Sequence, residues 1–332
     1  MILFILRRLV TMALTLLAIS FLVFVIIQLP PGDYVTTQIE EMIAQGTAVD
    51  AKRAEFLREQ YGLNQPFFVQ YLQWVWGLVR GDLGYSFEYN LPVADVVGDR
   101  LFLSMVLNVA TVIFIYVVSF PIGAYSATHQ YSWSDNGITF LGLLGLATPN
   151  FLLALILLYF ANVWFGTSIG GLMDPQYLNE PWSLAKVGSV LAHLWVPVFV
   201  IGTSGTAAMI RRLRANLLDE LQKQYVETGR AKGLSERRLL IKYPLRMSLN
   251  PFIADIGSLL PQIISGSVIV SFVMSLPTTG PMLLEALQSQ DMYLAGSFLM
   301  FLAMLTVVGM FLSDVLLAWL DPRIRLEGTV GG

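Results

Sequence analysis

Histidine and cysteine, which often bind metals or act as nucleophiles, are scarce in this chain. It contains no cysteine, which excludes disulfides, thiolate metal sites and cysteine nucleophiles. Its two histidines, His129 and His193, stand far apart in the sequence and have no cluster of other ligands beside them. We interpret each histidine as a locally satisfied polar group rather than as a metal ligand.

A loop that could bind the phosphates of ATP is also missing from the sequence. The P-loop needs a glycine followed directly by lysine, and that pair does not occur. The apolar segments contain no recognisable cluster of His, Asp and Ser that could act as a catalytic site. We therefore predict a chain that is not an enzyme and that binds no cofactor or metal.

The most distinctive polar feature is the basic stretch Arg211–Pro251, which contains half of all lysines and arginines. Apolar residues at its start recur at helical spacing: Leu213, Leu217, Leu218, Leu221 and Tyr225. This spacing predicts an amphipathic helix that continues out of the preceding apolar segment.

A second helix is expected after the first. Gly233 should end the first helix, because glycine accepts the left-handed conformation of a helix C-terminus. Ser235 should cap a short helix that has Glu236 in its first turn and that ends at Pro244. The two helices, at an angle to each other, would offer apolar side chains to a soluble partner.

The elements around this stretch are those of an integral membrane protein. The chain has 332 residues, 55% of them hydrophobic and 13% charged, with a mean hydropathy of +0.65. Six uncharged runs are each long enough for a membrane span of about 20 residues: 9–32, 101–128, 136–173, 187–210, 256–284 and 292–313. The third run contains Pro149, and we predict one kinked span followed by a loop.

The distribution of basic residues predicts the orientation in the membrane. Arg7 and Arg8 precede the first run, ten bases lie in the stretch 211–251, and Arg323 and Arg325 follow the last run. Because lysine and arginine accumulate on the cytoplasmic side, both termini and this stretch should be cytoplasmic.

Residues 33–100 are then external. This segment carries ten acids and five bases. Six of its residues fall on one helical face beside Trp74 and Trp76, which predicts a helix in the outer membrane interface: Phe68, Tyr71, Leu72, Val75, Leu78 and Val79.

Several motifs resemble the membrane subunits of ATP-binding-cassette (ABC) importers, in the dipeptide, oligopeptide and nickel branch and its B-type subunits. The run QYVETGRAKGLSERRLL, with Glu227 six residues before Gly233, is similar to the "EAA" loop of that family. The other motifs are LPPGD, LREQYGLNQP, GDLGYS, GLATPNF and the terminal DPR at 321–323, so the resemblance covers nearly the whole chain.

The resemblance implies that the stretch 211–251 contains a coupling helix, which docks into a groove on an ATP-hydrolysing subunit. The residues at matching positions are Glu227, Arg230, Ala231, Gly233, Leu234, Ser235 and Arg238. This copy departs from the usual loop at three places: Thr228 and Gly229 replace two alanines, and Asn250-Pro251 replaces a Leu-Pro pair. The alternative is a solvated basic loop, which would need charge but no order of helix, glycine and helix.

In the external segment, Gly81, Asp82 and Gly84 of GDLGYS match the family closely. The glycines suit a tight turn. Two roles stay open for these residues, namely docking of a substrate-binding protein and a structural lid without ligand contact.

The fold implied by the resemblance is all-α, type I-like, with six transmembrane helices. A long external segment follows helix 1, and the coupling helix lies between helices 4 and 5. We expect three parts: 1–32 as the cytoplasmic N-terminus and helix 1, 33–100 as the external (periplasmic) helical segment, and 101–332 as the transmembrane core of helices 2–6.

The implied function is that of a permease subunit. The chain would be a multi-pass protein in the lipid bilayer of a bacterial inner membrane, and no nucleic-acid partner is expected. Its partners would be a second homologous permease, two ATP-binding subunits that hold ATP and Mg, and an extracytoplasmic solute-binding protein. Small peptides are the expected cargo, and oligosaccharides, opines or nickel chelates are the alternatives. A stand-alone secondary transporter or channel is disfavoured, because neither an inverted repeat nor a ring of intramembrane charge is recognisable.

Overall fold

A computed structural model describes the backbone of residues 2–30, 32, 34–44, 55, 58–59, 62–166, 168–178 and 180–320. The side chains of residues 2–4, 40–42, 253–258, 260–261 and 317–320 are not part of that description. The DPR motif at 321–323, together with Arg325 and most of 45–61, lies outside the described residues. The chain forms two compact units, residues 1–102 with 278–308 and residues 103–277 with 309–332.

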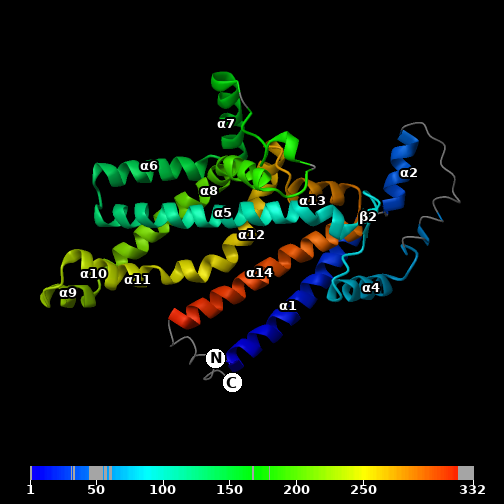
Figure 1. Cartoon of the computed structure of the whole chain (residues 1–332). Coiled ribbons are helices and arrows are strands. Elements are labelled where there is room, and N and C mark those ends of the chain that lie inside the picture. The colour runs from blue at the N-terminus through cyan, green and yellow to red at the C-terminus, as the bar shows by residue number, and fades with distance from the viewer. Residues whose placement is uncertain are drawn as a thin grey trace. The chain divides into compact units, whose positions relative to one another are not determined.

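The first unit is helical apart from one small hairpin. Its helices are α1 (Ile2–Gln28), α2 (Tyr34–Ala44), α4 (Phe67–Val79), the start of α5 (Val93–Thr128), α13 (Thr279–Gln288) and the first part of α14 (Met292–Leu320). Strands β1 (Tyr85–Ser86) and β2 (Leu91–Pro92) pair antiparallel, with Tyr85 opposite Pro92. The first part of α14 lies beside α1, as Figure 1 shows, and apolar residues of the two helices share one cluster.

Aromatic packing joins α1 to α4. The ring of Phe24 lies 5.0, 5.5 and 5.7 Å from the rings of Phe67, Tyr71 and Trp74, between centroids. Trp74 is almost fully buried, and the Ser20 and Tyr71 hydroxyls are hydrogen bonded at 2.9 Å. Such aromatic pairs stabilise a contact beyond the area that they bury.

The predicted apolar face of α4 divides into two stripes. Tyr71, Val75 and Leu78 pack toward the cluster with α1, whereas Phe68, Leu72 and Val79 are 67%, 64% and 73% exposed. The apolar face that was predicted to lie in the membrane interface is thus partly covered by α1, because the apolar arc of α4 is wider than the surface that α1 covers. The outer stripe suits a helix at the membrane interface.

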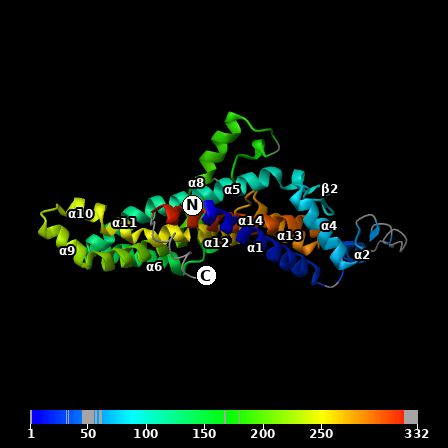
Figure 2. The ribbon, with the colours of Figure 1, turned by 90° about the horizontal axis from the view of Figure 1, so that it is seen from below.

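The second unit contains the rest of α5 and a series of helices that surround α8 (Leu184–Leu221). These are α6 (Trp133–Ala147), α7 (Asn150–Phe165), a 3-10 turn (Pro175–Tyr177), α9 (Gln224–Ala231), α10 (Glu236–Lys242), α11 (Pro244–Ser248) and α12 (Asn250–Val273). α6, α7, α11 and α12 all contact α8. Figures 1 and 2 both place α9 and α10 together beyond the end of α8.

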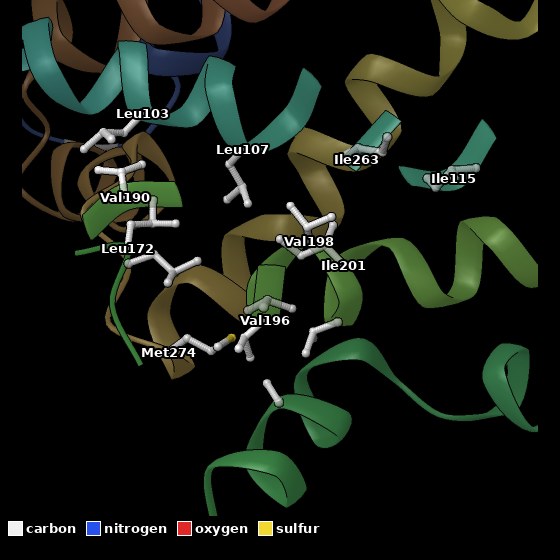
Figure 3. Packing of buried hydrophobic residues seen from close by; sticks show 14 of the residues in the cluster. Leu103, Leu107, Ile115, Leu172, Val190, Val196, Val198, Ile201, Ile263 and Met274 are labelled. Atoms are coloured by element: carbon white, nitrogen blue, oxygen red, sulfur yellow. The ribbon is translucent and has the colours of Figure 1, made fainter. Parts of the chain in front are cut away.

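The core of the second unit lies where α5, α8 and α12 meet (Figure 3). Leu107 and Ile115 come from α5, Val196 and Ile201 from α8, and Ile263 from α12, and all five are buried. The loop before α8 is fixed to the end of α12, because the Gly171 N–H donates to the Met274 carbonyl at 2.8 Å.

Several of these helices are long and apolar enough to cross a membrane. Among the described residues these are Ile5–Gln28, Val93–Thr128, Leu184–Leu221 and Met292–Leu316. The pair formed by α6 and α7 brings the number of candidates to as many as five, if the pair counts as one span. α12 contributes a shorter apolar helix, Gln262–Val273. An all-helical membrane protein is therefore confirmed.

Two of the predicted runs look different in the structure. The chain bends by 98° between α6 and α7, so the run 136–173, predicted as one kinked span followed by a loop, is sharply broken. The break lies at Thr148 and Pro149, since proline cannot continue the helical hydrogen bonds and disfavours a helical residue before it. The run 256–284 is also divided: α12 ends at Val273, and α13 begins at Thr279.

Candidate functional site

The predicted order of helix, glycine and helix is present in the basic stretch, as α9 and α10. Gly233 follows α9 with φ of +78°, the left-handed conformation that was expected. Its N–H donates to the Arg230 carbonyl at 2.9 Å, and the Leu234 N–H donates to the Gly229 carbonyl at 3.2 Å. These two bonds form a Schellman motif, which fixes the direction in which the chain leaves α9.

The first helix is shorter than predicted. α8 ends at Leu221, and the chain turns at Gln222 and Lys223 before α9 begins. Leu213 and Leu217 are buried as the helical spacing indicated, but Tyr225 lies on α9 and is 37% exposed. The prediction of one continuous helix to Gly233 was therefore wrong, because the apolar spacing carried no signal for the turn.

Gly229 sets the contact between α9 and α10. A Cβ atom at this position would lie 2.4 Å from Cδ1 of Leu239, a residue of α10 that is 1% exposed. The sequence shows Gly229 only as a departure from the family's alanine. In the structure its missing side chain lets Leu239 and Val226 close the two helices into one small apolar core.

An ion pair on the surface links the same two helices. The Arg230 guanidinium donates to both carboxylate oxygens of Glu236, at 2.8 and 3.2 Å. Arg230 holds the pKa of Glu236 below its ordinary value, so both groups are charged at neutral pH. Side chains this exposed, at 50% and 71%, contribute little to stability, so the pair mainly orients Arg230.

The residues predicted to couple the chain to an ATPase lie on this helix pair. Leu234 is partly buried, and the other six are exposed: Glu227, Arg230, Ala231, Gly233, Ser235 and Arg238. Ser235 precedes α10 with the backbone of an N-cap, yet its side chain makes no capping hydrogen bond. The pair thus presents a fixed, charged and largely exposed surface.

A buried ion pair ties α8, which leads into α9, to the start of α6. Arg214 of α8 donates from Nε and Nη2 to the two oxygens of Asp135, both at 2.8 Å. Asp135 also accepts from the Ser126 hydroxyl of α5 and from the Tyr131 N–H, and its side chain is 1% exposed. Three segments therefore converge on one carboxylate.

The sequence reasoning missed Asp135, although a local signal for it exists. Ser132 to Asp135 fits the pattern of a capping box, with serine as N-cap and an acid three residues later. In the structure the Ser132 hydroxyl accepts from the Asp135 N–H at 3.1 Å, and α6 begins at Trp133. The pairing with Arg214, distant in the sequence, carries no such signal.

The first unit holds the second predicted site, the turn of Gly81, Asp82 and Gly84. Both glycines have φ of +82°, which confirms the tight turn. The Asp82 carboxylate accepts from the Gly84 N–H at 2.9 Å. A Cβ atom at Gly84 would lie 2.3 Å from Cδ1 of Tyr293, so the hairpin approaches α14 closely.

Asp291 fastens this hairpin to α14. It is fully buried and accepts hydrogen bonds from the Ser86 hydroxyl at 2.6 Å and from the Glu88 N–H at 3.1 Å. Its other oxygen accepts from the Leu294 N–H at 3.1 Å, which caps α14. The sequence reasoning did not single out Asp291, although an aspartate before an apolar helix is a usual N-cap signal.

The described residues contain no group of three or more His, Asp or Glu side chains that could hold a metal ion. His193 contacts the Ser189 carbonyl at 2.8 Å through Nδ1, and His129 stacks on Tyr125. Each histidine is thus satisfied locally, as the sequence indicated.

Comparison with known proteins gives matches along nearly all of the chain. The family described as "Binding-protein-dependent transport system inner membrane component" matches residues 119–326, and its N-terminal family matches residues 1–108. The chain is 37% identical to the oligopeptide transport system permease protein AppB of Bacillus subtilis, over 97% of this chain and 99% of that protein. It is 29% identical to the dipeptide transport system permease protein DppB of Escherichia coli K12, over 97% and 98%.

Proposed function

Because the chain belongs to the family of inner-membrane components of binding-protein-dependent transport systems, we propose that it is the permease subunit of an ABC importer for small peptides. The assignment of small peptides as the cargo rests on the similarity, along nearly the whole chain, to permeases named for oligopeptides and dipeptides. The alternatives, oligosaccharides, opines or nickel chelates, are outcomes of the test below.

The helix pair α9 and α10 is the part that would respond to ATP. We infer that it docks on an ATP-hydrolysing subunit, which supplies the ATP and Mg sites that this sequence lacks. Three features support this role: the fixed angle at Gly229 and Gly233, the exposed charges, and the direct connection to α8. Closure of the ATPases would move α8 and, through Arg214 and Asp135, the start of α6 as one body.

The complete transporter would contain a sister permease, two ATPase subunits and an extracytoplasmic binding protein. The chain would then cross the membrane six times. The four long helices α1, α5, α8 and α14 are four spans, α6 with α7 is one span, and α12 is another. Both termini and the helix pair would then be cytoplasmic, and the turn at Gly81 would be external.

The orientation can be tested with single cysteines, since the wild-type chain has none. An Asn64→Cys variant should react with a membrane-impermeant maleimide in intact cells, because this residue is exposed and in the external segment. An Ala231→Cys variant, exposed on α9, should react only after the membrane is permeabilised. Labelling of Ala231→Cys in intact cells would overturn the proposed topology.

The cargo can be tested by growth and uptake. A strain that lacks this chain should lose growth on di- to pentapeptides as sole nutrient and should keep growth on oligosaccharides. Complementation by the wild-type chain is the control. Normal peptide uptake combined with loss of sugar uptake would contradict the peptide assignment.

A further inference from the structure

A cavity of about 440 Å³ opens beside the turn at Gly81, within the first unit. It is lined by α4, by the turn itself, by the hairpin and by α14: Gln73, Trp74, Gly77, Asp82, Gly84, Tyr85, Phe87, Asn90 and Tyr293. Its volume is within the range of small-ligand sites. Neither α9 nor α10 contributes a residue to its lining.

Four of the nine residues that line this cavity are aromatic. Trp74, Tyr85, Phe87 and Tyr293 contribute rings, and the Phe87 and Tyr293 rings meet edge to face at 5.4 Å. Aromatic rings attract a cation that lies over their faces. The Tyr85 hydroxyl is engaged with the Asn90 carbonyl, which keeps the hairpin tip in place.

The polar side chains of the cavity are one carboxylate, Asp82, and two carboxamides, Gln73 and Asn90. Asp82 gives one carboxylate oxygen to the Gly84 N–H, and within the described part of the chain it forms no ion pair. The nearest basic residue in sequence, Arg80, has its guanidinium 4.5 Å from the Trp76 ring instead. Among the described residues, the side-chain amides of Gln73 and Asn90 also make no hydrogen bond.

This combination selects one class of ligand. A divalent metal ion would need several carboxylates, and Asp82 is the single one that the described residues contribute to the lining. An anion would be repelled by the same carboxylate. An ammonium has three donors and no acceptor, which suits the carboxylate of Asp82, the amide oxygens of Gln73 and Asn90, and the aromatic walls.

We propose that the cavity at Asp82 binds a lysine or arginine side chain of the extracytoplasmic binding protein when that protein docks. This inference rests on the proposed function. The family is dependent on a binding protein by its description, and the external segment that surrounds Asp82 carries ten acids and five bases. A basic side chain on the partner would complement that charge.

The variant that tests this is Asp82→Asn, which keeps the shape and the acceptor for the Gly84 N–H while removing the charge. The matched control is Asp95→Asn, because Asp95 is an exposed acid of the same segment and does not line the cavity. The assay uses the whole transporter in nanodiscs and titrates the peptide-loaded binding protein while ATP hydrolysis is measured.

We expect Asp82→Asn to raise the half-maximal concentration of binding protein about tenfold and to leave the maximal rate unchanged. Its half-maximal concentration should also depend less on ionic strength than that of the wild type. Asp95→Asn should behave as the wild type. The Gln73→Leu variant changes a residue of α4 rather than of the turn. It should also raise the half-maximal concentration of binding protein, by a smaller factor.

Three results would overturn the inference. One is an Asp82→Asn titration equal to that of Asp95→Asn, and another is a lower maximal rate at an unchanged half-maximal concentration. The third is an effect of Asp82→Asn that disappears when the delivered peptide is N-acetylated, since the cation would then belong to the peptide. A wild-type transporter that the binding protein does not stimulate would overturn the proposed function as well, so the two failures are distinguishable.

Discussion

A Gly233→Asp variant should insert and assemble normally but lose peptide uptake and the ATP hydrolysis that substrate stimulates. Gly233 has φ of +78°, where a side chain costs about 1 kcal/mol. Apart from Gly233 itself and its two neighbours in the chain, no described residue has a heavy atom within 4 Å of the position that its Cβ would occupy. A Cβ atom at this exposed position therefore has open space, and the added carboxylate would project from the surface proposed to dock on the ATPase.

The large effect should come from the docked contact rather than from strain. A carboxylate in that contact would have to be desolvated without a partner of its own. Gly62→Asp is the matched control, because Gly62 also has a positive φ (+67°) and open space, but lies in the segment that we propose to be external. It should carry the same strain and keep transport.

The Gly233→Asn variant separates backbone strain further from the effect in the docked contact, since asparagine tolerates the left-handed conformation better than other side chains. Its peptide uptake and ATP hydrolysis should lie between those of the wild type and those of Gly233→Asp. Uptake and ATP hydrolysis would be measured in vesicles reconstituted with the complete transporter. If Gly233→Asp assembles and retains both activities at wild-type levels, Gly233 is not on the docking surface.

An Asp135→Ala variant should strongly destabilise the second unit. It would leave Arg214, whose side chain is only 24% exposed, without its carboxylate, and would remove the acceptor of the Ser126 hydroxyl and the Tyr131 N–H. Loss of one partner of a buried pair costs about 3 kcal/mol or more. We expect the midpoint of thermal unfolding of the purified transporter to fall by roughly 6 °C or more.

The control is Glu236→Ala, which breaks the exposed pair with Arg230 and should leave that midpoint unchanged. A double variant, Asp135→Ala with Arg214→Met, should be less destabilised than the sum of the two single variants, because neither charge is then left unpaired. Additive effects, or an unaltered midpoint in Asp135→Ala, would show that the pair does not hold α6 to α8.

Features that depend only on residues close together in the sequence could be predicted from the sequence alone. Long apolar runs predicted a helical membrane protein because the hydrocarbon core requires satisfied backbone groups. Gly233 predicted the end of α9, and the glycines beside Asp82 predicted a turn, because both rest on the backbone freedom of single residues. The break between α6 and α7 was more severe than expected, since Pro149 indicates where a helix is interrupted but not at which angle it resumes.

Contacts between distant segments were decided by the tertiary structure. In the sequence Gly229 is only a deviation from the family's alanine, and its contact with Leu239 is visible only in the structure. The pairing of Asp135 with Arg214 also has no signal in the sequence. The cavity at Asp82 likewise needs Trp74 from α4 and Tyr293 from α14. The physical reason is the same in each case: a side chain's role depends on which partner packing brings within a few ångströms, and a pattern read along one segment does not contain that partner.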